Sequence, residues 1–147
     1  MAKKKSAAFI ALCEKYGVDP NKVPEITSFE DACKALGKDP TVLPIVDHLP
    51  ESDQCRQLSD FKLSTIAHAI RGDKYSNYNN QNERKYFPVF EVRADKKRPS
   101  GFGLSCFVCV CWSSFSRVGV RLCFPERDMA VFFGQHFIEL HKDHHLV

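Results

Sequence analysis

Several cysteines are close enough in sequence to suggest a metal site. Cys106, Cys109 and Cys111 fall within residues 106–111, and Cys123 lies in the next predicted strand. Strand side chains alternate between faces, so Cys109 and Cys111 share one face while Cys106 points to the other. A tetrahedral zinc site needs ligands that converge, usually from a turn. We therefore expect these thiols to pack as small hydrophobic groups. A metal site and an oxidation-sensitive thiol pair are the alternatives.

The C-terminal histidines are a second possible ligand set. His141 and His145 are four residues apart, on one face of a predicted helix, and Asp143 lies between them. Polar and cationic residues are also favoured in a last helical turn by the helix dipole, without any metal. We expect that second explanation to hold, and we expect neither a metal nor a cofactor. His136 falls on the apolar face and is expected to be a hydrogen-bonded core or boundary histidine.

The segment 71–98 combines positive charge with aromatic and amide side chains, and basic residues outnumber acidic ones in it. Bases of single-stranded nucleic acid stack on aromatic rings above cationic grooves. We therefore expect this segment to contact single-stranded DNA or RNA. The expected contact residues are Lys74, Tyr75, Tyr78, Arg84, Lys85, Tyr86, Lys96, Lys97 and Arg98. The alternative is a solvated loop followed by a charged turn that protects an edge strand.

Recognisable enzyme motifs are missing from the sequence. It contains no phosphate-binding Walker loop, no dinucleotide fingerprint, no G-x-S-x-G and no H-E-x-x-H. We therefore favour binding over catalysis. A small hydrolase or nuclease is the alternative, because paired carboxylates cannot be recognised before the fold is known.

Length and composition are typical of one soluble domain spanning residues 1–147. The net charge of +3 does not by itself identify a nucleic-acid-binding protein. Seven cysteines, an odd number, favour the reducing cytosol. No apolar run approaches the roughly 20 residues of a membrane span. We expect a cytoplasmic protein without a membrane partner.

One unit occurs twice near the N-terminus, as FIALCEKYGVDPNKVP at 9–24 and FEDACKALGKDPTVLP at 29–44. Each copy predicts a short helix that ends at a glycine, Gly17 or Gly37, followed by Asp-Pro. Cys13 and Cys33 occupy matched core positions, small enough to let the two helices approach each other. We assign residues 1–48 to these duplicated helical units.

The rest of the chain predicts an α+β fold. A long helix covers 49–72 and a polar loop covers 73–85. An antiparallel sheet over 86–124 is expected to be a three-stranded meander, with strands at 86–92, 101–112 and 118–124. Residues 125–145 have the spacing of an amphipathic helix, which we expect to cover one face of the sheet.

Three segments carry a resemblance to known proteins: ITSFEDACKALGK at 26–38, NNQNERKYFPVFE at 79–91 and GVRLCFPERDMAVFFGQHFIELHKD at 119–143. In these motifs the chain resembles a family of small proteins encoded by phages and mobile elements of gut bacteria. The resemblance implies a context, the cytosol of a bacterial host, and no chemistry. Tyr75 and Tyr78 stand where that family tends to carry tryptophans.

Three roles are compatible with these observations. The first is an accessory protein that binds single-stranded nucleic acid. The second is a protein-interaction module that modulates a host or virion protein through the N-terminal units and a sheet edge. The third is a structural protein. The sequence leaves the oligomeric state open.

Overall fold

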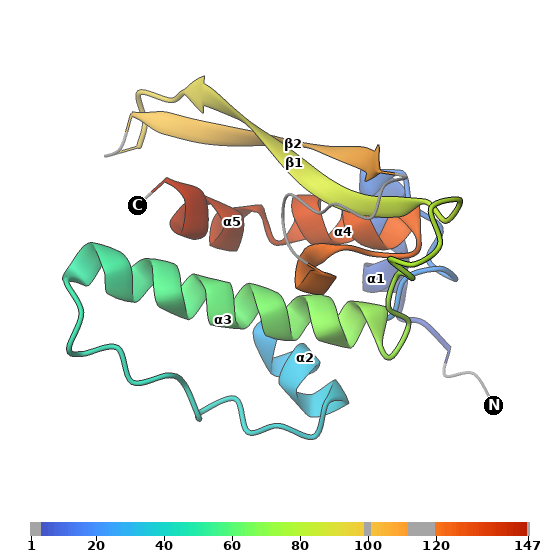
Figure 1. The fold of residues 1–147 in the computed structure, drawn as a ribbon, viewed down its shortest axis with the longest axis horizontal. Coiled ribbons are helices and arrows are strands. Elements are labelled where there is room, and N and C mark those ends of the chain that lie inside the picture. The colour runs from blue at the N-terminus through green and yellow to red at the C-terminus, as the bar shows by residue number, and fades with distance from the viewer. Residues whose placement is uncertain (1–3, 99–100, 112–119, 147) are drawn as a thin grey trace.

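The structure is a computed structural model that describes residues 4–98, 101–111 and 120–146. Its elements form successive layers (Figure 1): a β-hairpin lies over two C-terminal helices, a long helix runs beneath them, and a short helix packs below that one. The described elements are α1 (Ala7–Tyr16), α2 (Phe29–Ala35), α3 (Glu51–Arg71), β1 (Lys85–Ala94), β2 (Phe102–Cys111), the 3-10 helix η1 (Val120–Leu122), α4 (Arg127–His136) and α5 (Ile138–His145). The predicted α+β class is confirmed.

Both copies of the repeated unit fold as their local signals predict. The Phe9 amide donates to the hydroxyl of Ser6 at 3.2 Å, and the Asp31 amide donates to that of Ser28 at 3.0 Å. Gly17 and Gly37 follow the two helices with φ of 67° and 65°, which glycine adopts without strain. Local chemistry alone therefore accounts for both helix-turn units.

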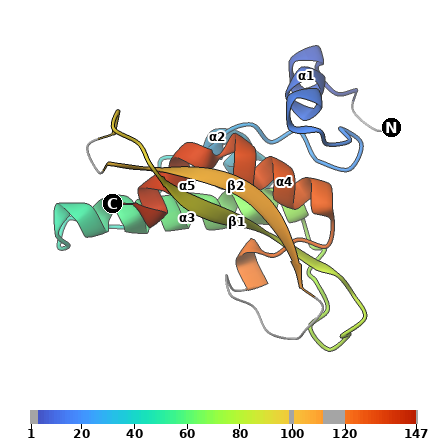
Figure 2. The ribbon, with the colours of Figure 1, turned by 90° about the horizontal axis from the view of Figure 1, so that it is seen from above.

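The two copies dock in different places. Helix α1 packs against α4 at one end of the molecule, whereas α2 packs against α3 (Figure 2). Cys13 and Cys33 are both buried, as predicted. Burial also raises the pKa of both thiols, which keeps them protonated and unreactive. Each cysteine therefore serves as a core residue in its own docking site.

The predicted third strand, residues 118–124, is not confirmed. Residues 118 and 119 lie outside the described residues, and Val120–Leu122 is a 3-10 helix. Of the described residues 120–124, only Phe124 pairs with the hairpin, in a single bridge to Tyr86 whose two N–H···O bonds measure 3.0 and 2.8 Å. The guanidinium of Arg71 takes the carbonyls of Arg121 and Cys123, which a β-ladder would otherwise use. Among the described residues the sheet therefore has two strands, paired from Lys85↔Cys111 to Ala94↔Phe102.

The predicted C-terminal helix is divided at Phe137, which has φ −98° and ψ 26°. No proline marks the break, and the apolar spacing across 125–145 continues through it. The sequence therefore contains no sign of the division. The ring of His136 is fixed just before the break, with Nδ1 3.1 Å from the Tyr16 hydroxyl and Nε2 2.9 Å from the Thr27 carbonyl oxygen. This confirms His136 as a hydrogen-bonded boundary histidine. The division directs α5 so that His141 lies under Phe90 of the hairpin, with the ring centroids 4.4 Å apart.

Helix α4 approaches the hairpin closely at Gly134, and so it covers one face of the sheet as predicted. A Cβ atom added at Gly134 would lie 2.5 Å from the Cys106 sulfur and 2.7 Å from the Pro88 Cβ. Cys106 therefore packs against a helix, and burial raises its pKa to about 11. Cys123 is buried, while the side chains of Cys109 and Cys111 lie outside the described residues.

We expect Gly134→Ala to destabilise the protein. In an exposed helix this change stabilises by roughly 1 kcal/mol, but here the added methyl overpacks the contact with β1 and β2 at a cost of about 1–3 kcal/mol or more. Urea denaturation would measure the difference. A double variant that adds Cys106→Ala removes the closest atom and should recover part of the loss. A Gly134→Ala protein as stable as wild type would contradict the close packing.

Stability should fall in mild acid because of His141, whose side chain is almost completely buried. Burial, and to a lesser degree His145 and His144, lower the pKa of His141 from 6.5 to about 3. Below pH 6.5 the unfolded chain therefore binds a proton that the folded chain excludes. The free energy of unfolding should drop by up to about 1.4 kcal/mol per pH unit between pH 6 and pH 5.

Denaturation at several pH values checks this. His141→Phe should flatten the slope, whereas His48→Phe, on an exposed loop, should leave it unchanged. An unaltered slope in His141→Phe would refute the assignment.

Candidate functional site

The structure divides the expected contact residues between two places. Lys74, Tyr75, Tyr78 and Arg84 lie in the loop before β1, whereas Lys96–Arg98 lie in the turn after it. These two segments flank opposite ends of β1 (Figure 1). A ten-residue strand separates them by roughly 30 Å. They therefore do not form one surface.

Lys85 is a structural residue of the loop. It is 1% exposed, and its ammonium donates to the carbonyls of Asn80 and Glu83, both at 3.0 Å. The ammonium also lies 5.4 Å from the centroid of the Tyr78 ring. Tyr86 is half-buried against the core and forms the bridge to Phe124. In this conformation Lys85 has no surface to offer a ligand.

The hairpin turn is attached to α5 through Arg98. Its guanidinium pairs with the carboxylate of Glu139, and its Nε lies 3.9 Å from that of Asp95. The Asp95 carboxylate also accepts the amide of Lys97 at 3.0 Å. Lys96 and Lys97 are exposed, so the turn keeps two solvated cations without an aromatic partner among the described residues.

An exposed tyrosine in the loop after α3 is backed by a buried cation from the last turn of that helix. Tyr75 is 51% exposed, and the guanidinium carbon of Arg71 lies 4.0 Å from its ring centroid. Arg71 is itself only 3% exposed. Its Nη1 donates to the Arg121 carbonyl at 2.7 Å and reaches the Cys123 carbonyl at 3.4 Å. The ring of Tyr75 is therefore held from one side by a rigid group.

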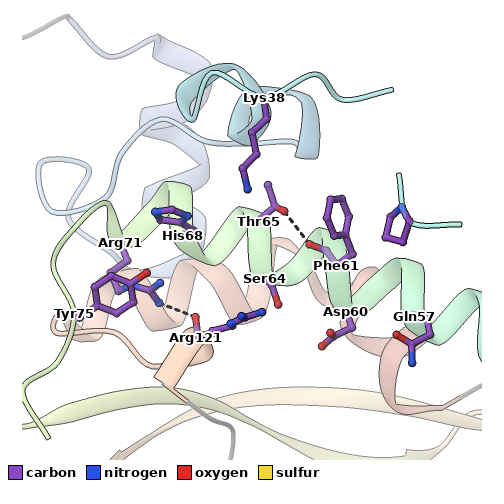
Figure 3. Close-up of a pocket in the computed structure, with 11 residues that line it drawn as sticks. Lys38, Gln57, Asp60, Phe61, Ser64, Thr65, His68, Arg71, Tyr75 and Arg121 are labelled. Atoms are coloured by element: carbon purple, nitrogen blue, oxygen red, sulfur yellow. Dashed lines mark hydrogen bonds between the residues drawn. The ribbon is translucent and has the colours of Figure 1, made fainter. Parts of the chain in front are cut away.

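A cavity of about 440 Å³ opens beside this tyrosine, between α3, the loop after α2 and η1 (Figure 3). Its charged groups are predominantly cationic, with Lys38, Arg71 and Arg121 against the single carboxylate of Asp60. The lining residues are Lys38, Pro44, Gln57, Asp60, Phe61, Ser64, Thr65, His68, Arg71, Tyr75 and Arg121. We call it the first hollow.

A second hollow, of about 340 Å³, lies on the other side of Arg71. Its lining includes four cations and no carboxylate. The residues are Lys5, Asn21, Lys22, Val23, Pro24, Ala69, Ile70, Arg71, Gly72, Lys74 and Met129. Arg71 lines both hollows, so positive charge continues around the end of α3. We call this region the α3-end surface, defined by Lys5, Lys22, Lys38, Lys74, Tyr75 and Arg121.

The two copies of the repeated unit contribute to different hollows. Pro24, the last residue of the first copy, lines the second hollow, and the equivalent Pro44 lines the first. Lys22 and Lys38 come from the same two units. Sequence analysis missed these lysines and Arg121, because each is a single basic residue in its own segment and only the fold brings them together.

We expect Lys85→Met to destabilise the protein. The substitution keeps the length of the side chain but removes the two hydrogen bonds that the buried ammonium donates to the Asn80 and Glu83 carbonyls, at a cost of about 1–3 kcal/mol. Thermal or urea denaturation would measure it. Lys96→Met removes an exposed cation from the distal turn and serves as the matched control. Equal stability of the two variants would contradict the structural role of Lys85.

Neither a metal site nor a membrane span is found in the described part of the chain. Within residues 4–98, 101–111 and 120–146, no group of three or more His, Cys, Asp or Glu side chains is placed to hold a metal ion. None of the helices in those ranges is long and apolar enough to cross a membrane. Protein-family models, curated proteins and solved structures gave no match to this chain.

Proposed function

We propose that this is a non-enzymatic accessory protein of a phage or mobile element that binds single-stranded DNA or RNA through the α3-end surface. The observation that carries the proposal is the exposed Tyr75 ring, which lines the first hollow and is backed by the buried Arg71, a residue that lines both cation-lined hollows.

The arrangement suits a flexible polyanion that carries flat bases. One side of the Tyr75 ring faces the Arg71 guanidinium, while half of the residue's surface remains open to solvent. Stacking of a base on an aromatic ring contributes about 1–3 kcal/mol and tolerates any base. Lys22 and Lys74 on one side, and Lys38 and Arg121 on the other, are positioned to neutralise phosphates before and after that base.

A single strand fits this surface better than a duplex. Stacking on a side chain requires an unstacked base, which duplexes do not offer. The cations also surround the end of α3 rather than following one face of a helix, which is the usual way of entering a major groove. Binding of this kind is expected to show little sequence preference and a strong dependence on salt.

A second candidate, a protein-interaction module, is favoured by a different observation. In the first copy of the repeat Val23 is buried, whereas in the second Leu43 is 40% exposed, with Val42 and Ile45 at 67% and 82%. Neighbouring exposed apolar side chains of this kind often mark protein contacts. This function would be favoured if the wild-type protein captures a host or virion protein after nuclease treatment and the Ile45→Asp variant does not.

The nucleic-acid proposal predicts that Tyr75→Ala weakens binding to a fluorescent single-stranded homopolymer by roughly 5- to 150-fold, through loss of base stacking. The double variant Lys22→Gln/Lys74→Gln should lower the slope of log K against log salt by about 1 to 2. Fluorescence anisotropy over a salt series measures both effects.

Lys97→Gln is the matched control, because it removes an exposed cation at the distant hairpin turn. It should leave the affinity nearly unchanged. Absence of binding at low salt would refute the proposal, as would an equal loss with Lys97→Gln and with Tyr75→Ala.

A further inference from the structure

The first hollow is polarised along α3. Towards the C-terminal end of the helix it is lined by His68 and Arg71, while Asp60 and Gln57 lie towards its N-terminal end (Figure 3). Lys38 reaches in from the chain after α2, and Arg121 enters from the opposite edge of the same hollow and points towards Ser64. One end of the hollow is therefore built for an anion, and the other for hydrogen-bond donors.

The cations of this hollow are not neutralised within the described part of the chain. Among those residues, Lys38, His68 and Arg121 form no salt bridge with a carboxylate, unlike Arg98 and Lys142 elsewhere on the surface. Arg71 uses Nη1 for two carbonyls, while its buried Nε has no hydrogen-bond partner in the structure.

The polar groups in the half of the hollow near Asp60 offer mainly hydrogen-bond acceptors. The Thr65 hydroxyl donates to the Phe61 carbonyl at 2.9 Å, so it can only accept from a ligand. Asp60 also accepts, and Gln57 both donates and accepts. The Phe61 ring and Pro44 supply an apolar wall beside them. The half near Asp60 would therefore offer hydrogen-bond acceptors and a flat apolar surface to a sugar and base, and the half near His68 would offer donors to their phosphate.

Size supports the same ligand class. Asp60 and His68 are eight positions apart on α3, so they are separated by about 12 Å along the helix. This is close to the length of one nucleotide. The volume of about 440 Å³ falls within the usual range for small-molecule sites, which is roughly 300–1,000 Å³.

We propose that the first hollow binds the phosphomonoester of a single nucleotide, held between Lys38, His68 and Arg121, with the sugar and base lying towards Asp60 and Gln57. A phosphomonoester carries about −1.5 to −2 charges at neutral pH, whereas each internal phosphodiester carries one. The excess of cations over the one carboxylate therefore matches a strand end better than the middle of a strand. The inference rests on the proposed function, because Tyr75, which lines the same hollow, would stack a base of the same strand.

Two sources of this ligand have to be separated, the phosphorylated end of a strand and a free mononucleotide. Anisotropy with otherwise identical oligonucleotides carrying a 5′-phosphate, a 3′-phosphate or no terminal phosphate tests the first source. Calorimetry with nucleoside monophosphates and with inorganic phosphate tests the second. We expect one of the two phosphorylated ends to bind at least about tenfold more tightly than the hydroxyl end. Free monophosphates should compete for the same site.

The double variant Lys38→Gln/Arg121→Gln should abolish the preference for the phosphorylated end without changing the melting temperature, since both side chains are exposed. His68→Gln should reduce the preference. Tyr75→Ala should weaken all the oligonucleotides equally, and Lys97→Gln should weaken none.

The outcomes separate the two proposals. Equal affinity for phosphorylated and hydroxyl ends, with no binding of free monophosphates, overturns this inference and leaves the proposed function standing. Binding of monophosphates alone, lost in Lys38→Gln/Arg121→Gln, supports the hollow as a mononucleotide site and overturns strand binding. Absence of all binding overturns both.

Discussion

The guanidinium of Arg71 connects the end of α3 to the chain that leads into α4, and both architecture and site depend on that contact. A buried charge is costly unless its hydrogen bonds are replaced, and here two backbone carbonyls and an aromatic ring replace part of them. The carbonyls belong to Arg121 and Cys123, so the contact fixes the segment just before α4. The ring belongs to Tyr75, so the same group fixes the first residues of the loop after α3. Arg71 also forms the wall between the two hollows.

This interaction explains where prediction of the fold from sequence succeeded and where it failed. The repeated helices and the long helix, predicted at 49–72 and found at Glu51–Arg71, depend on caps, glycine stops and apolar spacing that lie within a few residues. The prediction of a third strand was wrong for the described residues, because the Arg121 carbonyl accepts a hydrogen bond from Arg71, 50 positions earlier in the chain. The apolar spacing of 118–124 carries no trace of that partner. The break at Phe137 is equally invisible, since it accompanies contacts of His136 with Tyr16 and Thr27 more than 100 positions away.

The site shows the same limit. Composition drew attention to Tyr75 and Lys74, which line the two hollows, but it treated every basic residue in the segment as solvent-facing, which is the usual state of lysine. Lys85 departs from that rule because the loop folds back and supplies two carbonyls for its ammonium. Lys38 and Arg121 drew no attention because single cations in separate segments have no local signature. Charge counted along the chain therefore identified only some of the cationic residues that the fold brings together at the end of α3.

The two copies of the N-terminal repeat have different structural roles. Because caps and a glycine stop specify each unit locally, a second copy can fold wherever it finds an apolar surface. The helix of the first copy packs against α4, and the helix of the second packs against α3. Each then ends in a proline that lines one hollow, Pro24 in one case and Pro44 in the other. The copies have diverged in the residues after the turn, since Val23 is buried while Leu43 is 40% exposed. The second copy is therefore held mainly by its helix α2. The chain after α2, which lines the first hollow, has few buried side chains to hold it in place. A wall of this kind can adjust to a ligand at low energetic cost, which a wall built into the core cannot do.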